Sequence, residues 1–148
     1  MQLTRAADYG VRVMIHLASA GTPHRTSLTE LADAAEVSPA FLSKILQRLV
    51  KSGLVASRRG KKGGFELLDR GRAASLLDIL GALDGVPELN ACLTSGGCPR
   101  SSWCAAHPIW EEAQNRMHDV LSAATLEQLV AETRVRQTAL AASHRQES

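Results

Sequence analysis

The sequence predicts a mainly α-helical protein that carries one small β-hairpin. Of its 148 residues, 45% are apolar and only 3% are aromatic, so the core must consist largely of Leu, Val, Ile and Ala, which suit packed helices. Helix-capping signals recur along the chain, and two short apolar segments flank a glycine-rich turn. The length is that of one ordinary domain, or of a small domain with an appendage, which excludes two-domain Rossmann enzymes and barrel enzymes.

Two helices are expected near the start of the chain. The first spans about residues 4–19, where Thr4 precedes apolar residues on two adjoining faces, as in a helix that is buried on both sides. The second begins with a capping box at residues 27–30, in which a Ser hydroxyl and a Glu carboxylate each satisfy a free amide. It is expected to end near Glu36.

A third helix follows, with one apolar and one polar face. Ser38 is its expected N-cap, Pro39 occupies the first position, where no backbone amide is needed, and Gly53 ends it. The apolar stripe consists of Leu42, Ile45, Leu46 and Leu49. If that stripe packs on the second helix, the residues that face outward are Ser43, Lys44, Gln47, Arg48 and Lys51.

A basic hairpin comes next, at about residues 54–68. Residues 54–59 and 65–68 are each long enough for a short strand, and glycines between them supply the positive φ that a hairpin turn needs. Four cations surround the turn, namely Arg58, Arg59, Lys61 and Lys62. Two helices, a three-residue turn and a basic hairpin in this order are typical of a winged helix-turn-helix domain.

This order of elements predicts a protein that binds double-stranded DNA. The polar face of the third helix is expected in a major groove, and the hairpin on phosphates or in a narrow minor groove. Residues 1–70 carry 11 Lys and Arg against 6 Asp and Glu, which agrees with a polyanionic partner. The assigned DNA-contacting residues are Ser38, Ala40, Phe41, Ser43, Lys44, Gln47, Arg48, Arg58, Arg59, Gly60, Lys61 and Lys62. A helical bundle with a solubilising charged face is the alternative for each feature taken alone.

The rest of the chain predicts a short helix, a long loop and a long helix. A capping box at residues 75–78 opens the short helix, which is expected to pack on the first module. Helical periodicity then disappears, and it returns from about Pro108 to Ala123. The expected segments are 1–84 for the winged helix-turn-helix domain, 85–107 for a cysteine-rich loop, 108–130 for the long helix and a short one after it, and 131–148 for a flexible tail.

Three cysteines in the loop indicate a metal centre. Cys92, Cys98 and Cys104 are separated by five residues each time, and His107 follows the last of them. Thiolates are soft ligands that suit zinc or an iron-sulfur cluster, and an imidazole can complete a set of four. The wide, even spacing favours a cluster, whereas structural zinc sites usually use short C-x-x-C knuckles. Free or reversibly oxidised cysteines, and a Cys104–His107 nucleophile pair in a thiol-based redox enzyme, are the remaining alternatives.

The sequence also predicts where the protein resides. An odd number of cysteines within one short loop fits a reducing compartment better than a disulfide framework. No stretch approaches the roughly 18 apolar residues of a membrane span, and Arg5 and Asp8 lie where a signal peptide would be apolar. A cytoplasmic protein with no membrane partner is therefore expected.

Taken together, these residues resemble the winged-helix iron-sulfur transcription regulators of the IscR and NsrR type. The resemblance covers about residues 1–130. It rests on residues 1–4 with Tyr9, on the wing at residues 59–64, on the three cysteines and on residues 125–130. It implies a homodimer in which the long dimerisation helix crosses its partner, and a cluster that tunes binding to a pseudo-palindromic DNA operator.

The resemblance leaves two ligand sets open. His107 followed by Trp110 is similar to the branch in which three cysteines and that histidine hold a 2Fe-2S cluster, which is the set we favour. Asp8 is similar to the branch in which a carboxylate on the first helix reaches across the dimer to a 4Fe-4S cluster. Ser43 stands where the first branch carries an acid, so the operator preference of that branch is not carried over.

The resulting hypothesis is a dimeric transcriptional repressor rather than an enzyme. Its iron-sulfur cluster is expected to sense iron-sulfur status, redox state or nitric oxide and to control its affinity for DNA. The alternatives are a zinc-stabilised DNA-binding regulator without cluster sensing and a thiol-based redox enzyme.

Overall fold

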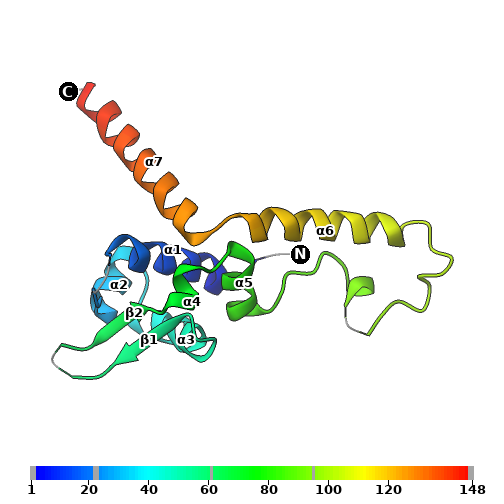
Figure 1. The fold of residues 1–148 in the computed structure, drawn as a ribbon, viewed down its shortest axis with the longest axis horizontal. Coiled ribbons are helices and arrows are strands. Elements are labelled where there is room, and N and C mark those ends of the chain that lie inside the picture. The colour runs from blue at the N-terminus through cyan, green and yellow to red at the C-terminus, as the bar shows by residue number, and fades with distance from the viewer. Residues whose placement is uncertain (1–2, 22–23, 61, 95, 147–148) are drawn as a thin grey trace.

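The computed structural model describes residues 3–21, 24–60, 62–94 and 96–146, and confirms a mainly helical chain with one hairpin. A helical domain carries the hairpin at one edge, and a long helix with a returning loop extends from the domain (Figure 1). The elements are α1 (Arg5–Ser19), α2 (Leu28–Ala35), α3 (Pro39–Lys51), β1 (Val55–Arg58), β2 (Gly64–Leu67), α4 (Asp69–Arg72), α5 (Leu76–Asp84), the 3-10 turn η1 (Ala91–Leu93), α6 (His107–Ala123) and α7 (Leu126–Gln146).

The helices begin where the sequence places their caps. Thr4, Ser27, Ser38 and Ser75 each accept a hydrogen bond from a backbone amide in the first turn of the helix that follows. Between α2 and α3 the chain turns at Glu36, whose φ of 56° is left-handed. This three-residue connection produces the helix-turn-helix unit that the sequence predicts.

The core lies between α1, α2, α3, α5 and the hairpin. The whole predicted stripe of α3 is buried, and α1 is buried on two sides, against α2 and α3 on one and α5 and α7 on the other. The hairpin strands pair antiparallel with Val55 opposite Leu67, which brings both of these buried side chains onto the core. The start of α7 closes the core with Leu126 and Val130.

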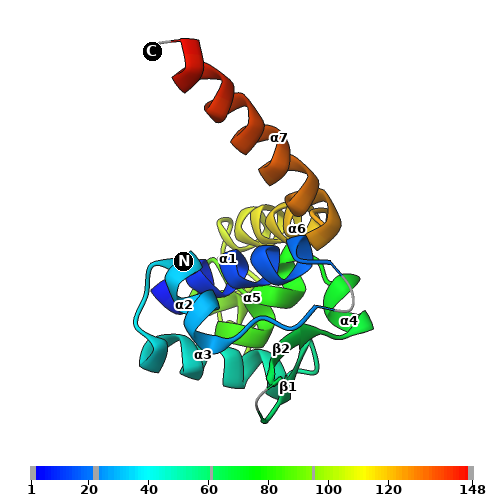
Figure 2. The same ribbon diagram turned by 90° about the vertical axis from the view of Figure 1, so that its left-hand side faces the viewer.

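Two segments differ from the sequence prediction. Residues 69–72 form α4, a single turn with no cap hydrogen bond from a side chain. Beyond residue 130, where the sequence analysis expects a flexible tail, α7 continues as helix to Gln146 (Figure 2). Arg136 pairs with Glu132 one turn earlier at 2.8 Å, and the Arg134 guanidinium donates to the Ser19 carbonyl of α1 at 3.3 Å, so polar bonds support the part of α7 that follows the core residues.

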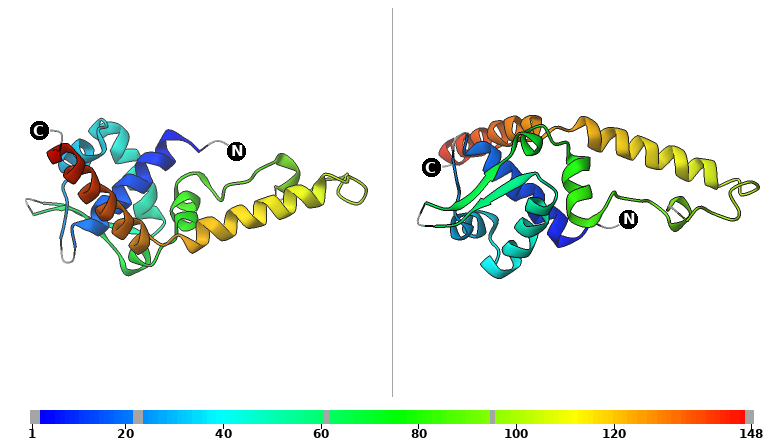
Figure 3. Two further views of the ribbon diagram at one scale, coloured as in Figure 1. Left: turned by 90° about the horizontal axis from the view of Figure 1, so that it is seen from above. Right: turned by 60° about the horizontal axis from the view of Figure 1, so that its bottom comes forward.

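The long helix α6 and the cysteine loop lie side by side and away from the domain (Figure 3). Two hydrogen bonds hold the first part of the loop on α6. His118 Nε2 donates to the Pro87 carbonyl at 2.7 Å, and the Leu89 amide donates to Gln114 Oε1 at 3.0 Å. The loop is therefore fixed to α6 before it reaches its first cysteine.

The capping box at the start of α5 offers a test of local stability. Ser75 Oγ accepts from the Asp78 amide at 3.1 Å, and the Asp78 carboxylate accepts from the Ser75 amide at 2.8 Å. We expect Ser75→Ala to lower the free energy of unfolding by about 1 kcal/mol. Urea unfolding followed by circular dichroism measures the change, and Ser122→Ala, at the exposed end of α6, is the control without a cap to lose.

The same box makes that difference depend on pH. The hydrogen bond from the Ser75 side chain, and then that from its backbone, hold the pKa of Asp78 below its usual 3.8. Because the folded state has the lower pKa, the stabilisation is complete above the unfolded pKa and is lost as the pH falls through the folded one. The gap in stability between the wild type and Ser75→Ala should therefore narrow below about pH 4. If the difference in stability between the wild type and Ser75→Ala stayed constant well below about pH 4, this role for the Asp78 carboxylate would be contradicted.

Candidate DNA-binding surface and cysteine pocket

The recognition helix α3 and the wing, β1 with β2, line one continuous groove. Its walls are Ser43, Gln47, Val50 and Lys51 from α3, and Ser57, Arg59 and Phe65 from the wing. The helix and the hairpin lie next to each other on one side of the domain (Figure 1), and the groove that both of them line is a surface of the kind that follows a DNA duplex. Ser43 and Gln47 are among the predicted base-contacting residues, and the structure brings them beside the wing cation Arg59.

The predicted DNA contacts at the start of α3 lie partly on the surface and partly against the core. Ser38 and Ala40 are exposed beside Lys44, in reach of a partner. Phe41 instead packs edge-on against Tyr9 of α1, with ring centroids 5.8 Å apart, and is half-buried. Phe41 therefore holds α3 on α1.

The cations of this surface are not equivalent. Arg58 lies 3.5 Å from Glu66, which also pairs with Arg25 at 3.2 Å, so its charge is partly offset within the wing. Across the ranges that the structure covers, the cations on α3 and the wing that are exposed and have no acidic partner are Lys44, Lys51, Arg59 and Lys62. Lys61 lies outside the described residues, and Gly60, with φ of 109°, forms the turn next to it. Lys51, which the sequence prediction does not assign to DNA, faces outward two turns after Lys44.

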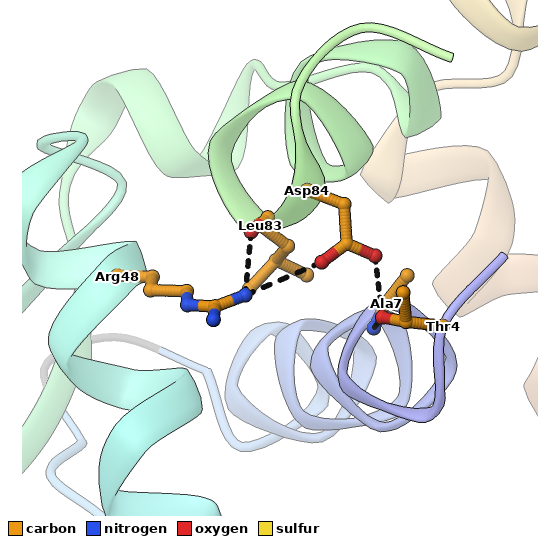
Figure 4. Close-up of polar contacts among 5 residues, drawn as sticks. All are labelled: Thr4, Ala7, Arg48, Leu83 and Asp84. Atoms are coloured by element: carbon orange, nitrogen blue, oxygen red, sulfur yellow. Dashed lines mark hydrogen bonds and ion pairs between the residues drawn. The ribbon is translucent and has the colours of Figure 1, made fainter. Parts of the chain in front are cut away.

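Arg48, a predicted DNA contact, has partners within the chain. Its Nη1 donates to the Leu83 carbonyl at 2.8 Å and lies 3.2 Å from Asp84 Oδ1, so the half-exposed guanidinium binds the end of α5 (Figure 4). A helix C-terminus attracts a cation because its last carbonyls lack partners within the helix. The partners lie 35 and 36 residues along the chain, so no local pattern in the sequence reveals them.

Arg59→Ala tests the assignment of the wing. A free cation that neutralises one phosphate releases about one counterion, so its loss should weaken binding on every DNA sequence and reduce the slope of log K against log salt by about 0.9. Fluorescence anisotropy over a salt series measures that slope. Arg136→Ala on α7 is the control, since it removes the same charge far from this surface. An Arg59→Ala protein with wild-type affinity and slope would disprove the wing contact.

A second candidate site is a pocket between the loop and α6. Its lining includes Cys92 and Cys98 from the loop and His107, Glu111 and Gln114 from α6. All three cysteines are free and half-buried, but Cys104 is not part of this lining. Of the four predicted ligands, the structure thus brings three to one pocket and leaves the fourth just before α6, where the Cys104 carbonyl accepts from the His107 amide at 3.1 Å.

His107 is held in an unusual way. Its side chain is 13% exposed, its Nε2 lies 3.5 Å from Glu111 Oε1, and its Nδ1 is buried without a hydrogen-bond partner. A buried polar atom without a partner is costly and points to a missing ligand. Glu111 could hold the imidazole as carboxylates do for metal-bound histidines, and the sequence analysis does not single it out. The feature of the sequence that could have indicated Glu111 is its position one helical turn after His107.

The alternative ligand Asp8 lies elsewhere. It pairs with Arg12 at 2.9 Å on the exposed surface of α1, which lies within the domain. The pocket is lined by the loop and by the first half of α6, and this part of the helix extends away from the domain (Figure 1). One chain therefore does not bring Asp8 to the cysteines. In the described ranges no three His, Cys, Asp or Glu side chains are arranged so that they could hold one metal ion.

Comparison with known proteins agrees with the winged helix. Residues 3–132 match the family model Rrf2, described as iron-dependent transcriptional regulator. The chain belongs to the Rrf2 family. It is therefore a transcriptional regulator with DNA as its partner, and no helix in the described part of the chain has the length and apolar character needed to span a membrane.

Individual Rrf2 relatives cover nearly the whole chain. The helix-turn-helix-type transcriptional regulator IscR of Vibrio cholerae is 29% identical over 91% of this chain and 78% of its own length. IscR of Cronobacter sakazakii is 29% identical over 88% of this chain and 80% of its own. Among solved structures, the global cysteine regulator CymR of B. subtilis matches with a TM-score of 0.72 at 27% identity, covering 89% of this chain and 98% of CymR. IscR of T. potens matches with a TM-score of 0.71 at 25% identity, covering 90% and 88%.

Proposed function

We propose that this Rrf2 protein is a homodimeric repressor whose affinity for a pseudo-palindromic operator is set by an iron-sulfur cluster in the cysteine pocket. The observation that carries the proposal is the buried Nδ1 of His107, which has no partner and belongs to a pocket that Cys92 and Cys98 also line. The similarity to the IscR relatives also supports this proposal.

The donor set fits such a group. The pocket has a volume of about 300 Å³, so space is not limiting. Cys92, Cys98, Cys104 and His107 would hold a 2Fe-2S cluster, and the partner subunit's Asp8 would be the fourth ligand in the 4Fe-4S alternative. When bound, the cluster would supply a redox-active iron centre that is sensitive to oxidants and nitric oxide. The cysteines need to be deprotonated to bind it, and His107 needs to keep Nδ1 unprotonated.

The exposed apolar residues of the long helix α6 support the proposed homodimer. None of the 17 residues of α6 is buried in the single chain, although the helix carries large apolar side chains. Ile109 is 66% exposed, Trp110 42% and Val120 70%. A second copy of α6 that crosses the first would cover them, and two-fold symmetry would then present two recognition helices to half-sites about 34 Å apart.

Anaerobic preparation tests the whole proposal. Protein that is purified without oxygen and supplied with iron and sulfide should become coloured, contain both elements in equal amounts, run as a dimer and bind operator DNA with an affinity that changes when the cluster is removed. Colourless protein with about one zinc per chain would favour the zinc-stabilised regulator. Protein that binds neither metal and responds to thiol oxidation would favour a cysteine-based sensor.

A further inference from the structure

Three helices meet at the last residues of α5. Asp84 Oδ1 pairs with Arg48 of α3, while Asp84 Oδ2 accepts a hydrogen bond from the hydroxyl of Thr4, the N-cap of α1 (Figure 4). The same Arg48 nitrogen also donates a hydrogen bond to the Leu83 carbonyl oxygen. Asp84 is thus bonded both to the recognition helix and to the N-cap of α1, and its side chain is 23% exposed, whereas that of Arg48 is 52% exposed.

Packing also holds this junction together. Leu83 lies over Gly10 of α1, where an added Cβ would come within 2.2 Å of the Leu83 side chain. The end of α5 therefore sits in a notch of α1 and has little freedom to move on its own. A displacement of this end would shift the partners of Arg48 as well.

The junction is also the point where the cysteine loop begins. Only Gly85 and Val86 separate Asp84 from Pro87, whose carbonyl is bonded to His118 of α6. Two residues later the Leu89 amide is bonded to Gln114, and Gln114 lines the cysteine pocket. A short tether thus joins the pocket and α6 to the carboxylate that holds the recognition helix.

We propose that Asp84 and Arg48 form a joint that couples the cysteine pocket to the placement of the recognition helix, with Arg48 as a positioning residue instead of a DNA contact. This inference rests on the proposed DNA-binding function. Buried apolar contacts hold α3 on the core without strong directionality, whereas the two bonds of Arg48 are directional and fix the helix relative to the end of α5. A change at the pocket that moves residues 85–89 would reach α3 through them.

Salt dependence separates a positioning residue from a DNA contact. With a fluorescent duplex that the wild-type protein selects from a random-sequence pool, we expect Arg48→Ala to weaken binding about fivefold while the salt slope stays unchanged, since no phosphate contact is lost. Lys51→Ala, on the same helix with a free cation, is the matched control and should reduce the slope by about 0.9. If Arg48→Ala reduced the salt slope as much as Lys51→Ala does, Arg48 would be a DNA contact. That result would overturn the proposed joint.

A double-mutant cycle tests the pair itself. Asp84→Asn removes the charge but keeps the size of the side chain, so it should weaken binding about as much as Arg48→Ala, and the double variant should be no weaker than either single variant. Effects that multiply in the double variant would show that the two residues act independently and would overturn the proposal. Thermal unfolding monitored by circular dichroism confirms that each variant compared is folded.

A third variant tests the connection to the pocket. Gln114→Ala frees the Leu89 amide from α6, and we expect it to change DNA affinity about threefold in the wild type but by less than about 1.5-fold in the Arg48→Ala background. Arg136→Ala, on α7 and away from both the pocket and α6, should have no effect in either background. An equal effect of Gln114→Ala in both backgrounds would overturn the joint.

These outcomes are distinct from failure of the proposed function. All samples are prepared anaerobically with matched iron and sulfide content, so the three comparisons do not depend on which cluster the pocket takes. If the wild type binds DNA and Arg48 behaves as an additive phosphate contact, the proposed coupling through Asp84 and Arg48 is wrong. The proposed function as a regulator is unaffected by that result. If the wild type binds no duplex from the pool, both proposals are wrong.

Discussion

Replacing Gly71 by Ala will destabilise the DNA-binding domain more than any surface substitution considered above. Gly71 lies buried in α4, and an added Cβ would come within 2.1 Å of the Leu54 carbonyl oxygen and 3.0 Å of its carbon. Both atoms belong to backbone, and that carbonyl already accepts a hydrogen bond from the Leu68 amide at 3.1 Å, so it cannot yield easily. We expect a loss of about 3 kcal/mol in the free energy of unfolding, or roughly 5–10 °C in Tm.

The control is the equivalent substitution in an open position. At Gly81, in the interior of α5, an added Cβ would meet only the Val86 side chain at 3.7 Å, which is an ordinary contact. Gly81→Ala should therefore be neutral, or stabilise α5 by about 0.5–1 kcal/mol, because Ala favours helix. Thermal and urea unfolding of both variants provide the comparison. If Gly71→Ala melts at the wild-type temperature, α4 does not pack against the base of the wing as closely as described.

Cys98→Ala will abolish cluster binding while leaving a folded protein. Cys98 lines the pocket beside His107, and its thiol is half-buried and free, so its removal deletes a proposed ligand without breaking a core contact. We expect iron, sulfide and visible absorbance to fall to background in anaerobically reconstituted protein. The affinity for operator DNA should become that of the cluster-free wild type.

A neighbouring residue provides the matched control. Ser101 lines the same pocket but carries no thiolate, so Ser101→Ala should retain the iron, the colour and the wild-type response of DNA binding. Elemental analysis, absorption spectra and circular dichroism on the same samples are the required measurements. A Cys98→Ala protein that keeps its full iron content would disprove the ligand set, and the loss of iron from both variants would indicate general damage to the pocket.

Much of the domain was predictable because its signals are local. The N-caps at Thr4, Ser27, Ser38 and Ser75 act on amides within three residues, and the apolar stripe of α3 repeats at helical spacing, so both are visible in short windows of sequence. The turn of the wing also depends only on its own glycines. These features were sufficient to predict a winged helix-turn-helix, and the match of residues 3–132 to the Rrf2 family confirms it.

The cysteine loop was predictable in composition but not in arrangement. Its spacing marks Cys92, Cys98, Cys104 and His107 as a set, yet the structure gathers Cys92, Cys98 and His107 at the pocket and adds Glu111 to its lining. The side chains of a long irregular loop take their positions from hydrogen bonds to α6, such as that between Leu89 and Gln114, and these partners lie 25 residues apart. No periodicity connects residues so far apart.

The sequence by itself determined the helices, the hairpin and the residue types that this regulator offers to DNA and to a metal centre, because capping, turn formation and amphipathic periodicity act over a few residues. Only the tertiary structure decided that Arg48 binds Leu83 and Asp84 and that Gly71 must lack a side chain beside Leu54. Each of these depends on atoms that meet only when distant helices pack, and packing in a dense interior assigns partners by shape and distance that a linear pattern does not encode.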